Sequence, residues 1–253
     1  MIGPRVEEDP VELFKDFLWS FADRDGELKY QQAVGRMIMA EQRSLVVDFD
    51  DLVAYNPSLA SRVTDEPDRA LPLLSSALEA VVKTVRRDYV ERAGRLFVRC
   101  RGAGLSTSIR KVDASLIGKM VNFTGVVTRA SAVKAYIAEG CYECPSCGQT
   151  VVSPTAVLTC VKCGHRTKLV EERSLFDNVQ LLVVQEETSA LSGGRMPRAI
   201  EVVLRGDLVD TVKPGDRVSV SGVVRPKKVR SLYDLYVDAN SSSPWSRSPR
   251  TWR

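Results

Sequence analysis

Five of the six cysteines and the only histidine of this 253-residue chain lie within residues 141–165, in the stretch CYECPSCGQTVVSPTAVLTCVKCGH. Thiolates and imidazoles at such spacing are typical zinc ligands. Two pairs have the form C-x-x-C-G, Cys144 with Cys147 and Cys160 with Cys163, and twelve residues separate them. The spacing predicts one tetrahedral Zn²⁺ held by four sulfurs. Because a closed four-sulfur shell leaves no position for water, we expect a structural zinc rather than a catalytic one.

Cys141 and His165 are the competing ligands within this stretch. Cys141 also stands at C-x-x-C spacing from Cys144, but Pro145 follows that pair and has no N–H to point at a thiolate. A glycine follows each preferred pair and permits the left-handed turn that brings backbone N–H groups near the sulfurs. His165 could replace one cysteine, although we expect its imidazole to be solvated or bonded to the backbone. Cys141 and Cys100 are interpreted as small apolar filling residues.

The sequence carries no recognisable catalytic motif. The glycine-containing segments GAGLSTSIRK and SGGRMPRA do not have the form G-x-x-x-x-G-K-[ST] of a phosphate-binding loop, and no G-x-S-x-G occurs. His165 is the only imidazole that could act as a general base. We therefore expect that this chain by itself is not an enzyme and has no catalytic residues.

The first 95 residues read as a helical bundle. In DPVELFKDFLWSFA, Asp9 is expected to cap a helix that begins at Pro10 and carries one apolar stripe. A second helix is expected over 30–40, and SLVVDFDDLVAY predicts a short strand that leads into a helical turn. The longest helix is expected over 73–93, with a buried stripe of Leu74, Leu78, Val81, Val82, Val85 and Tyr89.

After Gly94 the hydrophobic period changes to two, which is typical of strands. The β-rich runs are RLFVRCRG, KMVNFTGVVTRAS, VQLLVVQE, RAIEVVLRG, DRVSVSGVVR and LYDLYVDA. They predict an OB-type β-barrel made of residues 96–135 and 173–240, with the zinc ribbon inserted at 136–172 and a disordered tail at 241–253. The predicted fold class is α+β in several parts: an N-terminal helical bundle, an OB-type β-barrel and an inserted four-cysteine zinc ribbon.

The charge is divided unevenly along the chain. Residues 1–95 hold 13 Lys/Arg and 18 Asp/Glu, a net of −5, whereas residues 96–253 hold 23 and 14, a net of +9. A basic half indicates a polyanionic partner, although a solvated face with unequal charge explains the composition equally well. No apolar run reaches the roughly 18 residues of a membrane span, and the acidic start is unlike a secretory leader. We expect an intracellular protein with no membrane partner.

The run MPRAIEVVLRGDLVDTVKPGDRVSVSG, together with LIGKMVNFTGVVTRAS and the four-cysteine ribbon between them, resembles the N-terminal region of minichromosome maintenance (MCM) proteins. These are the ring-shaped replicative helicases of archaea and eukaryotes. The resemblance is close over about 96–224 and weaker in the helical first 95 residues. It implies a helical domain, an OB barrel and a projecting zinc ribbon that can mediate contacts between two hexamers. The family continues into an AAA+ ATPase, which this sequence does not contain.

The resemblance also implies where DNA binds. A hairpin after Val224, with its turn in RPKKVRS, corresponds to the one that points into the central channel of the ring. The loop EETSALSGGRMPR resembles the segment between the barrel and the motor domain. The residues that the resemblance marks as DNA-binding are Arg129, Lys134, Arg195, Arg198, Lys227, Lys228 and Arg230.

Two functions follow from these patterns. The preferred one is a DNA-binding and ring-assembly module of an MCM helicase, which grips single- or double-stranded DNA non-specifically and self-associates as a hexamer or double hexamer. The alternative is a stand-alone single-stranded DNA-binding protein built on the OB barrel and zinc. We expect the chain in the cytoplasm with the nucleoid of an archaeon, or in a eukaryotic nucleus.

Overall fold

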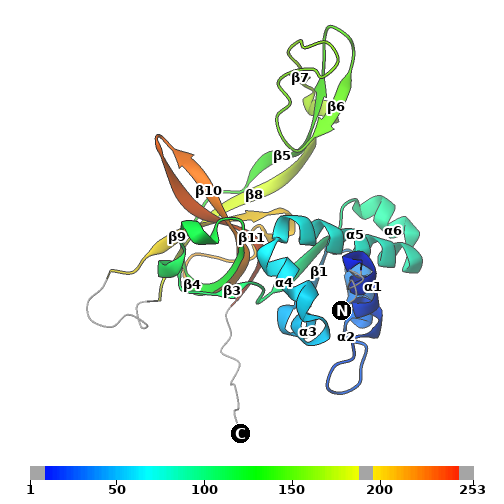
Figure 1. Ribbon diagram of the computed structural model, residues 1–253, viewed down its shortest axis with the longest axis vertical. Helices are drawn as coiled ribbons and strands as arrows, with labels where there is room; N and C mark the ends of the chain where they lie inside the picture. The colour runs from blue at the N-terminus through cyan, green and yellow to red at the C-terminus, as the bar shows by residue number, and fades with distance from the viewer. Residues whose placement is uncertain (1–8, 188–195, 245–253) are drawn as a thin grey trace, which may run out of the picture.

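The computed structural model describes residues 9–187 and 196–244. They form a helical part, a β-barrel, and a ribbon that projects from the barrel at the top of the view in Figure 1. The hairpin of strands β10 and β11 also projects from the barrel, on the side away from the helices (Figure 1). These parts confirm the predicted fold class, in which helices precede an OB-type sheet with an inserted cysteine cluster.

Helices surround a small parallel sheet in the first part. Asp9 caps the first helix as predicted, because its carboxylate accepts the backbone N–H of Val11 at 3.0 Å. The helices are α1 (Pro10–Ser20), α2 (Lys29–Met39), α3 (Phe49–Tyr55), α4 (Pro57–Asp65), α5 (Pro67–Val85) and α6 (Arg87–Ala93). The sheet pairs β1 (Ser44–Asp48) with β2 (Phe97–Arg101).

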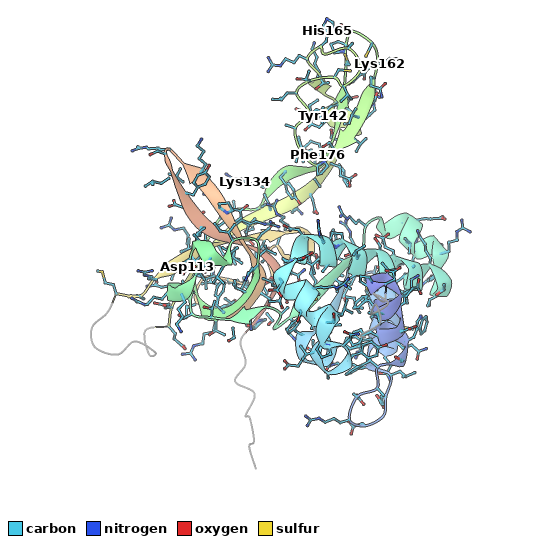
Figure 2. All side chains as sticks on the ribbon, in the orientation of Figure 1. Asp113, Lys134, Tyr142, Lys162, His165 and Phe176 are labelled. Carbon is cyan, nitrogen blue, oxygen red and sulfur yellow. The ribbon has the colours of Figure 1, made fainter. Side chains whose placement is uncertain are left out.

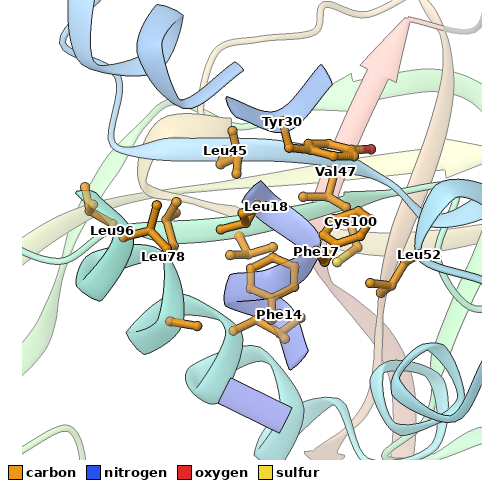
Figure 3. Close-up of a cluster of buried hydrophobic side chains, with 14 of the residues drawn as sticks. Phe14, Phe17, Leu18, Tyr30, Leu45, Val47, Leu52, Leu78, Leu96 and Cys100 are labelled. Atoms are coloured by element: carbon orange, nitrogen blue, oxygen red, sulfur yellow. The ribbon is translucent and has the colours of Figure 1, made fainter. Parts of the chain in front are cut away.

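The apolar faces of these helices meet in one core (Figure 3). Phe14 and Phe17 are fully buried, and the ring centroid of Phe17 lies 5.7 Å from that of Phe14 and 4.6 Å from that of Tyr30. Burial of each such ring stabilises the fold by roughly 1.5–3 kcal/mol. Strand β2 packs into this core through Val98 and Cys100, and it also contacts β11 of the barrel.

Two sequence-based expectations for this part are wrong. The helix expected over 73–93 is interrupted at Arg86, whose non-helical backbone (φ −155°, ψ 89°) separates α5 from α6. The interruption leaves Val85 53% exposed instead of buried, while Tyr89 still packs in the core. Residues 96–101 were expected in the barrel, but Phe97–Arg101 form β2, which pairs with β1. Leu96 and Cys100 are therefore buried in the helical core.

The barrel is closed by five strands in the order β4–β10–β11–β9–β8, with β8 pairing back onto β4. Such a closed five-stranded arrangement is the OB type. Its strands are β4 (Met120–Ala130), β8 (Leu175–Gln185), β9 (Ala199–Arg205), β10 (Arg217–Val229) and β11 (Leu232–Pro244). Strand β3 (Leu105–Ser106) and the short 3-10 turns Ile109–Lys111, Ala114–Leu116 and Gly206–Leu208 complete this part.

Strand β11 extends further than expected. Ser241–Pro244, expected to open a disordered tail, pair with the start of β10, so that expectation is wrong for these four residues. The remainder of the expected tail, residues 245–253, lies outside the described residues. Ser241 is buried where it pairs with Ser221 of β10, so the barrel continues through these residues.

The ribbon grows out of the barrel through two long strands. β5 (Lys134–Glu143) pairs first with β8 and then, beyond Gly140, with β6 (Thr150–Ser153) and β7 (Lys168–Leu169). The 3-10 turn Glu171–Arg173 leads the chain back into β8. The stem therefore shares its hydrogen bonding with the barrel, which holds the ribbon at a defined angle.

One bulge joins the helical part to the barrel. The register of β10 with β11 shifts between Ser221 and Gly222, which leaves Asn240 without a strand partner. Its side chain turns to β2 instead: the amide oxygen accepts the N–H of Cys100 at 2.7 Å, and the amide nitrogen donates to the carbonyl of Val98 at 3.0 Å. The side chain of Asn240 therefore makes to the backbone of β2 the two hydrogen bonds that a neighbouring strand would otherwise make.

Candidate metal centre and nucleic-acid interface

The four cysteines of the two C-x-x-C-G pairs converge at the end of the ribbon. Their sulfur atoms all lie within 4.8 Å of one another, with 3.4 Å between Cys144 and Cys163 and 3.7 Å between Cys147 and Cys160. Sulfurs bound tetrahedrally to zinc at about 2.3 Å stand about 3.8 Å apart. The group fits a zinc ion, and it could hold a metal with all four sulfurs.

Both knuckles are built by the same local geometry. Gly148 and Gly164 have φ of 67° and 72°, and each donates its N–H to the carbonyl of the first cysteine of its pair at 2.9 Å. The N–H groups of Cys163 and Lys162 hold the pKa of Cys160 down to about 6. The backbone N–H of His165 lowers the pKa of Cys163, but burial and the hydrogen bonds with Cys144, Cys147 and Cys160 raise it by more. The thiolate is the form that binds zinc, so the N–H groups around Cys160 favour zinc binding by that sulfur.

The two competing ligands lie outside the group. Cys141 is buried in β5, where it pairs with Val152 of β6. His165 stands at the outer end of the ribbon (Figure 2), and its Nδ1 lies 3.1 Å from the carbonyl oxygen of Cys163. Sequence spacing alone left these residues as alternatives, whereas the fold brings neither to the four sulfurs.

Three of the basic residues predicted to bind DNA border strand β8, and all three side chains are exposed. Lys134 lies opposite Val179, Arg129 lies opposite Val183, and the carbonyl of Arg198 accepts the N–H of Glu186. At about 3.3 Å per residue, the three positions extend along about 23 Å of β8, with Arg129 and Lys134 at one edge of the strand and Arg198 at the other. In Figure 2, Lys134 lies between the hairpin and the stem of the ribbon.

The hairpin holds the other three described residues of the predicted set. Arg230 and Ser231 make its turn, and Val229 pairs with Leu232. Lys228 and Arg230 are exposed, and no acidic side chain of residues 9–187 and 196–244 forms an ion pair with either. Lys227 differs, because its ammonium lies 2.9 Å from the carboxylate of Glu201 on β9.

Arg198 directly precedes β9. Glu186 accepts the backbone N–H of Arg198 at 3.0 Å and the guanidinium of Arg110 at 3.1 Å. Burial raises the pKa of Glu186, but these hydrogen bonds and the charge of Arg110 lower it by more, so the carboxylate stays ionised. Arg195, also predicted to bind DNA, lies outside the described residues.

Two acidic residues of this surface were missed by the sequence analysis. Glu201 lies 26 positions before Lys227, and Glu186 lies 76 positions after Arg110, so neither pairing has a local spacing that could reveal it. Only the alternation of Glu201 with apolar residues in RAIEVVLRG indicated that its side chain points outward from a strand.

The fold and the cysteine group define a class: an OB barrel with an inserted four-cysteine ribbon, preceded by a helical domain. Family comparison agrees over most of the chain, since residues 11–102 match the MCM N-terminal domain and residues 108–228 match the MCM OB domain. The chain belongs to the minichromosome maintenance family, as the sequence resemblance predicted.

Individual relatives support this assignment. The minichromosome maintenance protein MCM of Saccharolobus solfataricus is 28% identical over 94% of this chain and 38% of its own length. The DNA replication licensing factor MCM2 of Arabidopsis thaliana is 28% identical over 91% of this chain and 25% of its own length. The zygotic DNA replication licensing factor mcm6 of Xenopus tropicalis is 30% identical over 87% of this chain and 28% of its own length. The chain therefore spans well under half the length of these relatives.

Proposed function

We propose that this chain is the DNA-binding and ring-assembly module of an MCM helicase. The observation that carries the proposal is the set of exposed basic side chains that border β8, in a barrel that matches the MCM OB domain. Lys and Arg side chains that replace counterions on phosphates bind DNA without sequence preference. The contacts we assign to DNA are those of Arg129, Lys134, Arg198, Lys228 and Arg230, with Arg195 as a further candidate.

The ribbon serves this module as a rigid, metal-stabilised projection. We propose that Cys144, Cys147, Cys160 and Cys163 hold one structural Zn²⁺, since the spacing of their sulfurs fits that ion. The metal adds no chemistry of its own, because four sulfurs leave no position for water or substrate. Its binding free energy stabilises a segment whose described strands are short.

The partners of the module are DNA, further copies of the chain in a hexamer or double hexamer, and an AAA+ motor that hydrolyses ATP. The match to the MCM N-terminal and OB domains, over well under half the length of the relatives, supports this proposed division of labour. Among the residues that the structure describes, no helix is long and apolar enough to cross a membrane. We place the protein with chromosomal DNA, in the cytoplasm of an archaeon or the nucleus of a eukaryote.

Salt dependence of DNA binding tests the electrostatic part of the proposal. Log affinity should fall linearly with log salt, with a slope of about −0.7 for each phosphate contact on a single strand. Replacement of Lys227, Lys228 and Arg230 together by Ala should flatten that slope. An unchanged slope would place the DNA elsewhere on the basic half of the chain.

A stand-alone single-stranded DNA-binding protein is the second candidate function. The large exposed fraction of Tyr233, 62%, favours it, because proteins of that class stack bases on aromatic side chains. The two candidates differ in their assembly: a ring module forms hexamers, whereas the alternative binds DNA as a monomer. The mass of the protein in solution, with and without DNA, distinguishes them.

A further inference from the structure

The hairpin has two chemically different faces, and the register of its strands separates them. Side chains of residues directly opposite each other in a pair point to the same face, and successive residues alternate. One face therefore carries Arg225, Lys227, Asp234 and Tyr236, and it continues the outer surface of the barrel. The other carries Pro226, Lys228, Tyr233 and Leu235, and it continues the inner surface.

The outer face is occupied by contacts within the protein. The guanidinium of Arg225 binds both carboxylate oxygens of Asp68 at the start of α5, one of them at 2.7 Å. The hydrogen bond to Glu201 raises the pKa of Lys227, and Asp234 lies directly opposite this lysine. Each cation of this face has an acidic neighbour, so the face offers little net charge to an anion, and its role is to hold the hairpin against β9 and α5.

The inner face changes character as it leaves the barrel. Leu235 still packs against the barrel core, whereas Tyr233, two residues nearer the turn, is 62% exposed. Lys228 lies directly opposite Tyr233, and it has no ion-pair partner in the part of the chain that the structure describes. An unpaired cation thus stands beside an exposed aromatic ring.

The turn adds a second unpaired cation. Arg230 has a φ of 56°, a conformation that costs a side chain about 1–2 kcal/mol and that glycine adopts freely. An arginine therefore occupies a position where glycine would be more stable. This cost is consistent with a contact that needs the guanidinium at the tip of the hairpin.

We infer that this inner face is a subsite for one unstacked base of single-stranded DNA. The base stacks on the ring of Tyr233, and the flanking phosphates lie on Lys228 and Arg230. The inference rests on the proposed DNA-binding function and deepens it, because it selects the single strand: in a duplex the faces of the bases are covered by their neighbours. It also makes Lys227 a positioning residue rather than a DNA contact.

The test compares binding of the full chain to an oligothymidylate and to a duplex of equal length. Tyr233→Ala should weaken binding to the single strand by about 5- to 150-fold, the range for one stacked base, and change duplex binding little. Tyr233→Phe keeps the ring and should bind as the wild type does. Lys228→Ala should reduce the salt slope on the single strand by about 0.7, whereas Lys213→Ala, a lysine beside the turn before β10, should not.

The outcomes separate the subsite from the wider function. If the wild type binds both DNAs and Tyr233→Ala binds each of them with the affinity of the wild type, the subsite is refuted while DNA binding stands. Wild-type protein that binds neither DNA refutes the proposed function itself. If Tyr233→Ala instead alters only self-association, the side chain of Tyr233 contacts another copy of the chain, and the inference is wrong. Circular dichroism of each variant shows whether the barrel is intact.

Discussion

Replacement of Asn240 by Ala should weaken the contact between the helical part and the barrel and lower the free energy of unfolding. The substitution removes both side-chain hydrogen bonds to β2, those to the N–H of Cys100 and the carbonyl of Val98. Cys100 is 0% and Val98 is 2% exposed, so water does not readily replace the lost partner. The bond from the guanidinium of Arg99 survives, because it goes to the backbone carbonyl of residue 240.

The expected loss follows from the two buried backbone groups. Each buried polar group left without a partner costs about 1–3 kcal/mol, so the substitution should lower the free energy of unfolding by about 2–6 kcal/mol. That is a large share of the roughly 5–15 kcal/mol that typically separates folded from unfolded protein. Urea unfolding followed by circular dichroism measures it, and a second transition should become visible if the two parts then unfold separately.

Asn178→Ala is the matched control, since Asn178 is exposed on β8 and its side chain makes no hydrogen bond within the described residues. The free energy of unfolding of Asn178→Ala should differ from that of the wild type by no more than about 0.5 kcal/mol, as for other surface substitutions. If Asn240→Ala behaves like this control, the side chain of Asn240 does not bridge the two parts, and the reasoning about the bulge is wrong.

Four further predictions concern metal, charge, acid stability and activity. Metal analysis of Cys141→Ser should still find one zinc per chain, whereas Cys147→Ser should lose it; the reverse result would show that the knuckle was chosen wrongly. Glu201→Gln should change the salt slope of DNA binding by much less than 0.7, because Lys227, which it releases, lies on the outer face of the hairpin, away from Lys228. Burial raises the pKa of Asp207, but the charge of Arg99 and the hydrogen bonds from Arg99 and Ser44 together lower it by more, to below its usual 3.8. This carboxylate therefore stabilises the fold above that pH, and the stability is lost as the pH falls through the lowered pKa. Asp207→Asn should therefore flatten the loss of stability below about pH 4 in acid titrations of unfolding. Purified protein should not turn over ATP with or without DNA, because the sequence has no phosphate-binding loop. Turnover that survives repurification would show that an ATPase site exists without that motif.

Elements with local causes were predictable from the sequence. The cap at Asp9 and the apolar stripe after Pro10 lie within a few residues of each other, and they predicted α1. The C-x-x-C-G spacing likewise places two sulfurs on one tight turn, so each knuckle could be predicted without knowledge of the fold. Alternation in the second half of the chain predicted strands, because period two requires only neighbouring residues, and the number of strands indicated a barrel.

Features that depend on distant partners could not be predicted. No glycine or proline marks the interruption at Arg86, and nothing in RLFVRCRG shows that it pairs with a strand about 50 residues earlier. The bulge at Asn240 and the ion pair between Lys227 and Glu201 arise only when separate strands meet. The basic residues of the hairpin were identified, but their division between two faces required the register.

The most direct test of the proposed module is its mass in solution measured by analytical ultracentrifugation, with and without a labelled DNA strand. A ring of six chains of 28.0 kDa has a mass of about 168 kDa. Ring assembly predicts this species, formed or stabilised by DNA, with one strand bound per ring and an affinity that falls steeply with salt. A species of one chain that binds one strand, at every protein concentration, would contradict ring assembly and favour the stand-alone DNA-binding protein.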